Sequence, residues 1–200
     1  METLFQIIIL IFSAILHEYS HGAMAYSLGD PTAKNAGRLT LNPMAHLDWF
    51  GSVLLPAVMV LSRLPFVFGW AKPVPYNPYL LKDRRWGDAK VAIAGPAANL
   101  AIAIALGLVI RLMPFSEAFT NFVAIAVLIN IVLAVFNLVP LPPLDGSKIL
   151  ASFLPEKLKV KYLSLERFGF ILVIVFVMFG VGIIEPLVFG IFRLITGMGI

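Results

Sequence analysis

The chain has 200 residues, of which 60% are hydrophobic and 13% are charged, whereas soluble domains average roughly 45–50% apolar and about 25% charged residues. This composition excludes an ordinary soluble domain and indicates an integral membrane protein. The sequence contains no cysteine, which excludes disulfides and thiolate metal sites, so any bound metal needs nitrogen and oxygen ligands. A net charge of +4 without a basic and aromatic patch gives no sign of nucleic-acid binding.

Five apolar segments approach the roughly 20 residues that a membrane-spanning helix requires. We expect four full transmembrane helices, over about residues 4–28, 91–113, 119–139 and 168–194. The first follows Glu2 without a basic leader and runs directly into ionisable residues, which indicates a retained helix rather than a cleaved signal peptide.

The remaining apolar segment, about 50–68, is interrupted by Pro56, Arg63 and Pro65. An arginine inside a membrane is costly unless it reaches an interface or a partner. We therefore expect this segment to be re-entrant or to lie shallow in the bilayer, although by length alone it could be a fifth span.

Two stretches that flank this segment carry signals of extended backbone. Polar and apolar side chains alternate along Arg38, Leu39, Thr40 and Leu41, which predicts a short exposed strand. In WAKPVPYNP, residues 70–78, three residues directly precede prolines, which disfavours a helix there. Because the linkers are short and no internal repeat is visible, we predict one intramembrane domain over residues 1–200. Its expected fold is an all-α polytopic bundle of four helices, with a re-entrant or shallow segment and a small β-strand element near the active site.

The stretch AILHEYSHG, residues 14–22, places three ionisable side chains in the first apolar helix. His17 and His21 are four residues apart, so their imidazoles lie on one helix face and can bind one ion. Glu18 projects about a quarter turn away, where it can act as the base for a bound water. Ionisable groups within a membrane helix are costly, which favours a functional site. The plainer alternative is an interfacial helix end at which the three side chains face solvent.

A catalytic zinc usually takes three protein ligands and leaves one position for water, so a third donor is needed. The best candidate is Asp145, within NLVPLPPLDG, residues 137–146. The prolines of this stretch end the preceding helix and Gly146 permits a tight turn, which leaves the carboxylate at the helix mouth. Taken alone, Asp145 is an ordinary loop aspartate, whereas beside the two histidines it becomes their expected partner.

These motifs resemble those of the site-2 proteases, zinc metalloproteases that cut the transmembrane helices of other proteins. The resemblance lies in HEYSH, followed by the pattern N-x-x-P-x-x-x-L-D-G at Asn137, Pro140, Leu144, Asp145 and Gly146. Further stretches match the short bacterial-type members, namely LNPMAHLDWFG (41–51), FGWAKPVPYNP (68–78) and AGPAANL (94–100). The likeness covers about residues 10–150, and it includes neither the PDZ insertion nor the CBS domain of larger members.

The resemblance implies that His17, His21 and Asp145 bind one Zn²⁺, that Glu18 is the catalytic base and that Asn137 binds the substrate backbone. The implied activity is hydrolysis of peptide bonds within or near the transmembrane helices of single-span membrane proteins in the lipid bilayer, as in regulated intramembrane proteolysis. A helical substrate must be unwound before it is cut, and an exposed strand edge can supply replacement hydrogen bonds. We expect Arg38, Leu39, Thr40 and Leu41 to form that edge.

The two halves of the site and the distribution of charge predict the orientation. If segments 50–68 and 91–113 both spanned, the end of the first helix and Asp145 would face opposite sides, and the zinc site could not form. Basic residues precede the 91–113 helix and follow the 119–139 helix, whereas none precedes the first helix. By the positive-inside rule the site opens towards the cytoplasm, in what we expect to be a bacterial cell membrane.

Other residues allow two interpretations each. Gly95, with other small residues of its segment, favours tight helix packing over a catalytic role. Asn99 needs a partner for its amide in the membrane, which is either a structural hydrogen bond or a substrate in a groove. His46 with Asp48 could form a second metal pair, but interfacial hydrogen bonding is favoured because the zinc ligands are already complete. Glu185 before Pro186 indicates a helix break or end more readily than a gate.

Two other classes of function fit parts of the sequence. An intramembrane metal-ion transporter also uses histidine and carboxylate side chains, but it has little use for Glu18 beside a ligand pair, and the chain shows no repeated halves. A catalytically inactive scaffold would be expected to have lost a ligand, whereas all four catalytic positions are present.

Overall fold

A computed structural model describes residues 2–54, 58–59, 61–62 and 72–198. Within these residues the regular structure is entirely helical. Four helical stretches are long and apolar enough to cross a membrane, namely Thr3–Ser27, Gly87–Leu112, Glu117–Asn137 and Glu156–Phe179. The prediction of an all-α polytopic membrane protein is therefore confirmed.

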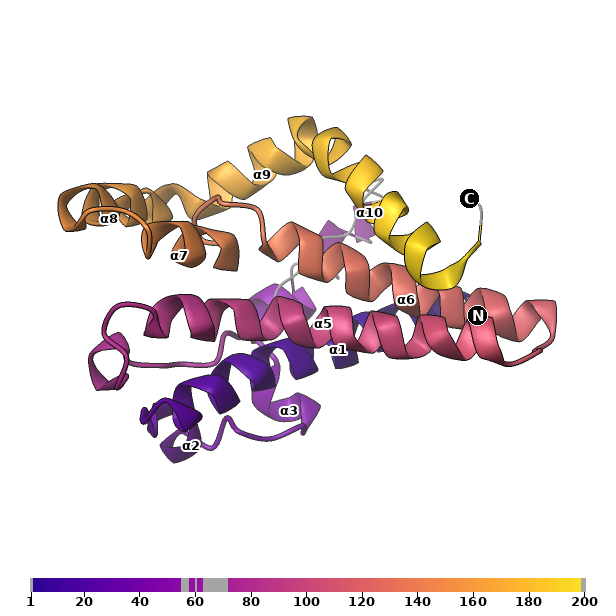
Figure 1. Ribbon diagram of the computed structural model, residues 1–200, viewed down its shortest axis with the longest axis horizontal. Coiled ribbons are helices and arrows are strands. Elements are labelled where there is room, and N and C mark those ends of the chain that lie inside the picture. The colour runs from indigo at the N-terminus through magenta and orange to yellow at the C-terminus, as the bar shows by residue number, and fades with distance from the viewer. Residues whose placement is uncertain (1, 55–57, 60, 63–71, 199–200) are drawn as a thin grey trace.

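Three long helices form the centre of the molecule (Figure 1): α1 (Glu2–Ser27), α5 (Gly87–Leu112) and α6 (Glu117–Asn137). A short turn joins α5 to α6, and the Ser116 side chain caps α6 by accepting a hydrogen bond from the Phe119 amide. Because α5 and α6 run antiparallel, the beginning of α5 and the end of α6 lie at the same end of the bundle.

The polypeptide between α1 and α5 leaves and returns at that same end. The Lys82 amide donates a 2.9 Å hydrogen bond to the Leu28 carbonyl, and the Asn77 amide donates one of 2.6 Å to Asp30. The described elements between α1 and α5 are short: α2 (Thr32–Asn35), α3 (Pro43–His46), a π-helical turn η1 (Trp49–Leu54) and a 3-10 turn η2 (Pro78–Leu80). The expected re-entrant or shallow segment 50–68 falls largely outside the described residues.

The strand expected at Arg38–Leu41 is not formed, and the backbone there is irregular. Its hydrogen-bonding groups have other partners, since the Arg38 amide donates to the Ala33 carbonyl and the Thr40 carbonyl faces the His46 ring at 2.8 Å. A strand needs a neighbouring strand to pair with, and none exists in the described part of the chain. The alternation of polar and apolar side chains alone could not indicate that this partner strand is missing.

After α6 the chain forms α7 (Asp145–Ala151), α8 (Glu156–Leu163), a 3-10 turn η3 (Ser164–Phe168), α9 (Gly169–Phe179) and α10 (Val181–Thr196). The span expected over 168–194 is thus two helices that meet at Gly180 and diverge in Figure 1. The Phe176 ring occupies the place that a β-carbon on Gly180 would take, so only glycine permits this bend. Pro186 lies inside α10, and the break comes before it.

Helix α10 returns to the centre of the bundle and packs against α5 and α6. Val188 and Phe192 of α10 lie in one buried cluster with Ala103 of α5 and Ile131 of α6. The Arg111 guanidinium donates a 2.8 Å hydrogen bond to the Leu194 carbonyl, which ties the ends of α5 and α10 together. As the described residues form it, this core joins α5, α6 and α10 and includes no residue of α1.

Candidate active site

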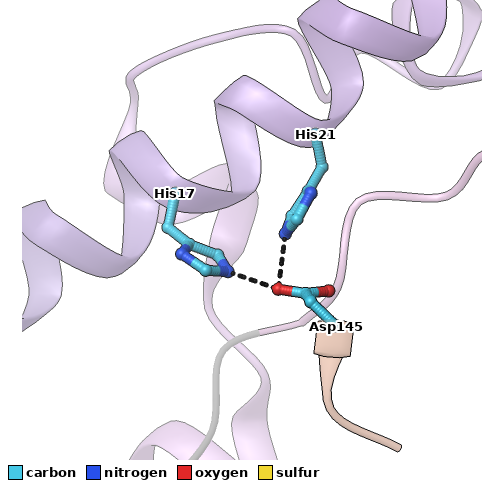
Figure 2. Close-up of side chains that lie close together, drawn as sticks. All are labelled: His17, His21 and Asp145. Atoms are coloured by element: carbon cyan, nitrogen blue, oxygen red, sulfur yellow. Dashed lines mark hydrogen bonds and ion pairs between the residues drawn. The ribbon is translucent and has the colours of Figure 1, made fainter. Parts of the chain in front are cut away.

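His17 and His21 lie on one face of α1, and both imidazoles point towards Asp145 of α7 (Figure 2). The Nε2 atom of each ring lies 3.1 Å from the same carboxylate oxygen, Oδ2 of Asp145. All three residues are buried, with at most 9% of their surface exposed. The fold therefore brings Asp145, which lies 128 and 124 positions from the two histidines, to the pair with which we expected it to share one ion.

The second nitrogen of each ring faces an oxygen that can only accept a hydrogen bond. Nδ1 of His17 lies 2.6 Å from Oδ1 of Asn99, and Nδ1 of His21 lies 2.7 Å from the Val91 carbonyl oxygen. Each neutral ring therefore carries its proton on Nδ1. The lone pair of Nε2 on each ring is left to face Asp145.

Three electron-pair donors converge at this point: two Nε2 lone pairs and a carboxylate oxygen, all within 4.8 Å of one another. Such groups repel each other in a buried, low-dielectric site unless a proton or a metal cation lies between them. Two imidazoles and one carboxylate are a ligand set typical of catalytic zinc, whose bonds of about 2.0–2.1 Å place tetrahedral ligands roughly 3.3 Å apart. The 3.1 Å separations are close to that value, so the residues present fit a zinc ion.

The end of α6 and the start of α7 position Asp145. Helix α6 ends at Asn137, and after the proline-rich turn α7 begins at Asp145 itself. A β-carbon on Gly146 would collide with the backbone carbonyls of Leu138 and Val139. Gly146 therefore allows α7 to begin directly against the end of α6, and this close approach directs the carboxylate at the two histidines.

Glu18 lies beside this centre and is held by the extended segment that precedes α5. One of its carboxylate oxygens accepts a 2.7 Å hydrogen bond from the Val74 amide. A cavity of about 160 Å³ opens here and is lined by the three convergent residues and by Glu18, Pro73, Val74, Tyr76, Asn137 and Lys148, among others. This volume admits several water molecules, so the site can be wetted although His17, His21 and Asp145 are buried.

Tyr76 closes one side of the same cavity, with Lys148 lying over its ring at 5.4 Å. Burial, with the nearby negative charges of Asp88, Asp145 and Glu166, raises the pKa of the Tyr76 hydroxyl above its ordinary value. This shift favours the protonated hydroxyl, the form that can donate a hydrogen bond.

Gly95 of α5 faces the two imidazoles directly. A β-carbon built on it would lie 2.5 Å from Nε2 of His21 and 2.6 Å from Nε2 of His17. These distances are far below van der Waals contact, so any larger residue would intrude on the atoms that face Asp145. We expected Gly95 to serve tight helix packing, and the surface against which it packs is the pair of imidazoles of His17 and His21.

The residues predicted to contact substrate lie in three different environments. Asn137 lines the cavity and donates from its amide to the Leu133 carbonyl at 2.9 Å. Asn99 is fully buried and bonds to His17, which favours the structural alternative over a substrate groove. The segment Arg38–Leu41 does not line the cavity as the described residues form it. The Arg38 guanidinium links the segment to the cavity wall, because it donates to the Lys72 carbonyl at 2.6 Å and to the carbonyl of Pro73, a lining residue, at 3.4 Å.

His46 does not belong to the ion site. It is buried, its Nε2 faces the Thr40 carbonyl, and its backbone carbonyl accepts a 2.9 Å hydrogen bond from the Lys72 amide. These contacts fit the hydrogen-bonding role expected for it. The described residues show one cluster with metal-binding composition, namely His17, His21 and Asp145. A larger cavity of about 370 Å³, lined by Arg84, Arg85 and Lys159 among others, contains none of the predicted site residues.

Comparison with known proteins relates these residues to a family. The model of peptidase family M50 matches residues 113–181, which include Asp145. Zinc metalloprotease YwhC of Bacillus subtilis, a provisional name, is 40% identical over 178 residues, which cover 84% of this chain and 78% of YwhC. The chain belongs to peptidase family M50, the site-2 proteases.

Two further relatives are less similar to this chain. A relative provisionally named zinc metalloprotease Rip2, from Mycolicibacterium smegmatis, is 30% identical over 82% of this chain and 63% of its own length. MJ0611 of Methanocaldococcus jannaschii, provisionally named in the same way, is 28% identical over 68% of this chain and 63% of its own length. The chain thus spans less than two thirds of these two relatives. No solved structure gives a significant match.

Three features of the candidate site were not predicted from the sequence. They are the hydrogen bond from the Val74 amide to Glu18, the contact of Gly95 with the imidazoles, and the hydrogen bond between Asn130 and Asn99. A signal was present for each. Val74 is the residue between two prolines, Gly95 lies four residues before Asn99, and Asn130 is a polar side chain in the apolar segment of α6.

Proposed function

We propose that this membrane protein is an intramembrane zinc metalloprotease that hydrolyses peptide bonds within or near the transmembrane helices of single-span proteins. One observation carries the proposal: in a bundle of apolar helices, His17 and His21 direct their Nε2 lone pairs at the Asp145 carboxylate, with Glu18 beside them. The provisional names of the relatives, zinc metalloproteases, support it.

His17, His21 and Asp145 would hold the zinc ion, and Glu18 is the general base. When bound, zinc supplies Lewis-acid activation of a water molecule and of the scissile carbonyl. Glu18 accepts the proton of the attacking water on its carboxylate and passes it to the leaving amine. The Val74 amide holds Glu18 in place, so the carboxylate needs little reorganisation between these two transfers.

Asn137 is our candidate for binding the substrate backbone. Its side chain lines the cavity and gives one amide hydrogen to its own helix, at the Leu133 carbonyl. The second amide hydrogen and the side-chain carbonyl remain available to a peptide. Tyr76 lines the same cavity and carries a second potential donor, its hydroxyl, for the developing oxyanion.

The contact of Arg38–Leu41 with substrate stays a prediction. This segment forms no strand, so an unwound substrate would have to pair with irregular backbone. Replacing Leu41, which is 53% exposed, with proline removes one backbone donor. Cleavage should then fall while zinc stays bound, and unchanged cleavage would dispose of this role.

We further propose that the site opens towards the cytoplasm of a bacterial cell. The ends of α1 and α6 and the starts of α5 and α7 meet at one end of the bundle (Figure 1). Most of the described basic residues lie in the segments that meet at this end, and Lys159 of α8 lies 3.6 Å from Asp88 of α5. Arg111 and Arg193 lie instead in the last turns of α5 and α10. Positively charged loops stay in the cytoplasm, so water should reach the cavity from that side.

The test of the proposed function is cleavage of a single-span membrane substrate by the purified protein and by its Glu18→Gln variant. A protease loses cleavage in the variant while zinc content is unchanged, because Glu18 is no ligand. A metal transporter would keep metal flux into vesicles in the variant. A scaffold would cut no substrate in either form.

A further inference from the structure

A line of buried amides runs from α6 through α5 to the metal-site histidine of α1, and it begins at Asn130. This side chain is 1% exposed, and its Nδ2 donates a 2.9 Å hydrogen bond to the Ala126 carbonyl of its own helix. A carbonyl only accepts, so this bond fixes which end of the Asn130 amide is nitrogen. Oδ1 of Asn130 is thereby directed at α5.

The next residue in the line is Asn99, which has no exposed surface. Its Nδ2 donates to Oδ1 of Asn130 at 2.9 Å and to the Ser13 carbonyl at 3.3 Å. Both partners are acceptors, so the orientation of the Asn99 amide is fixed in turn. Oδ1 of Asn99 is left to face Nδ1 of His17 at 2.6 Å.

The line ends at His17, where it determines which ring nitrogen carries the proton. An acceptor opposite Nδ1 keeps the ring proton there and leaves the Nε2 lone pair facing Asp145. If Asn99 were reversed, an N–H would face Nδ1, the ring would carry its proton on Nε2, and that proton would occupy the ligand atom. The bond from Asn130 opposes this reversal, because a reversed Asn99 would turn its carbonyl towards Oδ1 of Asn130.

We propose that Asn130 is a positioning residue for the metal centre. Although it lies outside the cavity and touches neither substrate nor ion, its side-chain carbonyl fixes the orientation of Asn99 and, through it, the tautomer in which His17 can bind zinc. The inference rests on the proposed zinc site. Groups behind a ligand commonly control metal affinity in this way.

A buried asparagine between membrane helices can also act only as a helix-to-helix hydrogen bond. The two roles differ in what they affect: a purely structural bond stabilises the α5–α6 pair, whereas the positioning role controls zinc affinity. The zinc affinity of the folded protein therefore separates them, independently of proteolytic activity.

The experiment measures the zinc dissociation constant of the purified full chain in detergent, by competition with a chelator, for wild type, Asn130→Leu and Asn130→Asp. Leucine has a similar volume but no acceptor, so zinc affinity should fall by about 10–100-fold, the range usual for loss of a group behind a ligand. Aspartate, whether protonated or charged, keeps an acceptor facing Asn99, and its affinity should stay within a few-fold of wild type.

Val127→Ala is the matched control. Val127 is fully buried in α6, three residues before Asn130, and has no hydrogen-bonding side chain. Its truncation leaves a cavity and should lower the thermal stability without changing zinc affinity. If Asn130→Leu does not fold, Asn130→Ser replaces it, because the shorter side chain cannot reach the Asn99 amide, and the same loss of affinity is expected.

Wild-type affinity in the folded leucine or serine variant would overturn the positioning role. An equal loss of affinity in Asn130→Asp, or in Val127→Ala, would also overturn it, because the effect would then come from packing and not from the acceptor. Failure of the wild-type protein to bind stoichiometric zinc would instead overturn the metal site itself, so the two failures are distinguishable.

Discussion

The Val74 amide and the Glu18 carboxylate are joined by a hydrogen bond of 2.7 Å, although the two residues lie 56 positions apart. Val74 stands between Pro73 and Pro75, neither of which has an amide hydrogen. Val74 is therefore the one backbone donor of this tripeptide, and it is directed at Glu18, the proposed general base. The prolines favour an extended backbone, and because they lack amide hydrogens they leave Val74 as the donor that faces Glu18.

Replacing Val74 with proline removes this donor and should lower the turnover number. A hydrogen bond to a charged group is worth about 1.5–3 kcal/mol, so we expect a fall of roughly 10–100-fold in kcat with a smaller change in KM. Val74→Ala keeps the amide and should stay within a few-fold of wild type. Equal activity of the proline and alanine variants, with zinc bound in both, would show that the amide has no such role.

Replacing Gly95 with alanine should abolish zinc binding without unfolding the protein. The added methyl group would lie 2.5–2.7 Å from atoms of both imidazoles, so the rings must move away from Asp145. We expect at least a 100-fold loss of zinc affinity, measured by chelator competition, because both ring ligands are displaced. Gly190→Ala is the matched control, because a β-carbon there meets nothing within 4 Å in α10. Stoichiometric zinc in Gly95→Ala at wild-type affinity would contradict the observed approach of α5.

Replacing Asp30 with asparagine should destabilise the loop that positions residues 72–77, in a pH-dependent way. Asp30 is fully buried and accepts hydrogen bonds from the Thr32 and Asn77 amides. Burial acts to raise its pKa, but these bonds and the Thr32 hydroxyl together hold the pKa below its ordinary value of 3.8. The carboxylate therefore contributes stability that is present above that value and is lost as pH falls through the folded-state pKa.

The stability difference between wild type and Asp30→Asn should be about 1–3 kcal/mol at pH 7. It should shrink below roughly pH 4, where wild-type Asp30 becomes protonated on unfolding. The measurement is the apparent unfolding temperature of both proteins in detergent across this pH range. A difference that stays constant down to pH 3 would show that the charge of Asp30 contributes nothing.

The residues that converge at the candidate site could be predicted from the sequence, because each carries a local or chemical signal; their roles as ligands and base stay a proposal. His17, Glu18 and His21 are ionisable residues in an apolar helix, and Asp145 follows a proline-terminated helix. The number and approximate bounds of the first three long helices also follow from apolar length. These features depend on local chemistry and on the cost of burying charge in a membrane.

What could not be predicted depends on contacts between distant segments. The break at Gly180 depends on where the Phe176 ring packs, and the roles of Gly95 and Asn130 depend on how closely α1, α5 and α6 approach one another. The irregular backbone at Arg38–Leu41 shows the converse, because an alternating pattern becomes a strand only beside another strand. Such contacts leave no periodic signal in the sequence.

The central claim is that one zinc ion is held by His17, His21 and Asp145. The most direct measurement is X-ray absorption at the zinc edge, combined with metal analysis, on the purified intact protein and on Asp145→Ala. We predict one zinc per chain, with two imidazole nitrogens and a carboxylate oxygen at about 2.0–2.2 Å, and loss of the ion or of the carboxylate oxygen in the variant. A wild-type protein without stoichiometric zinc, or a zinc environment that is unchanged in Asp145→Ala, would contradict the claim.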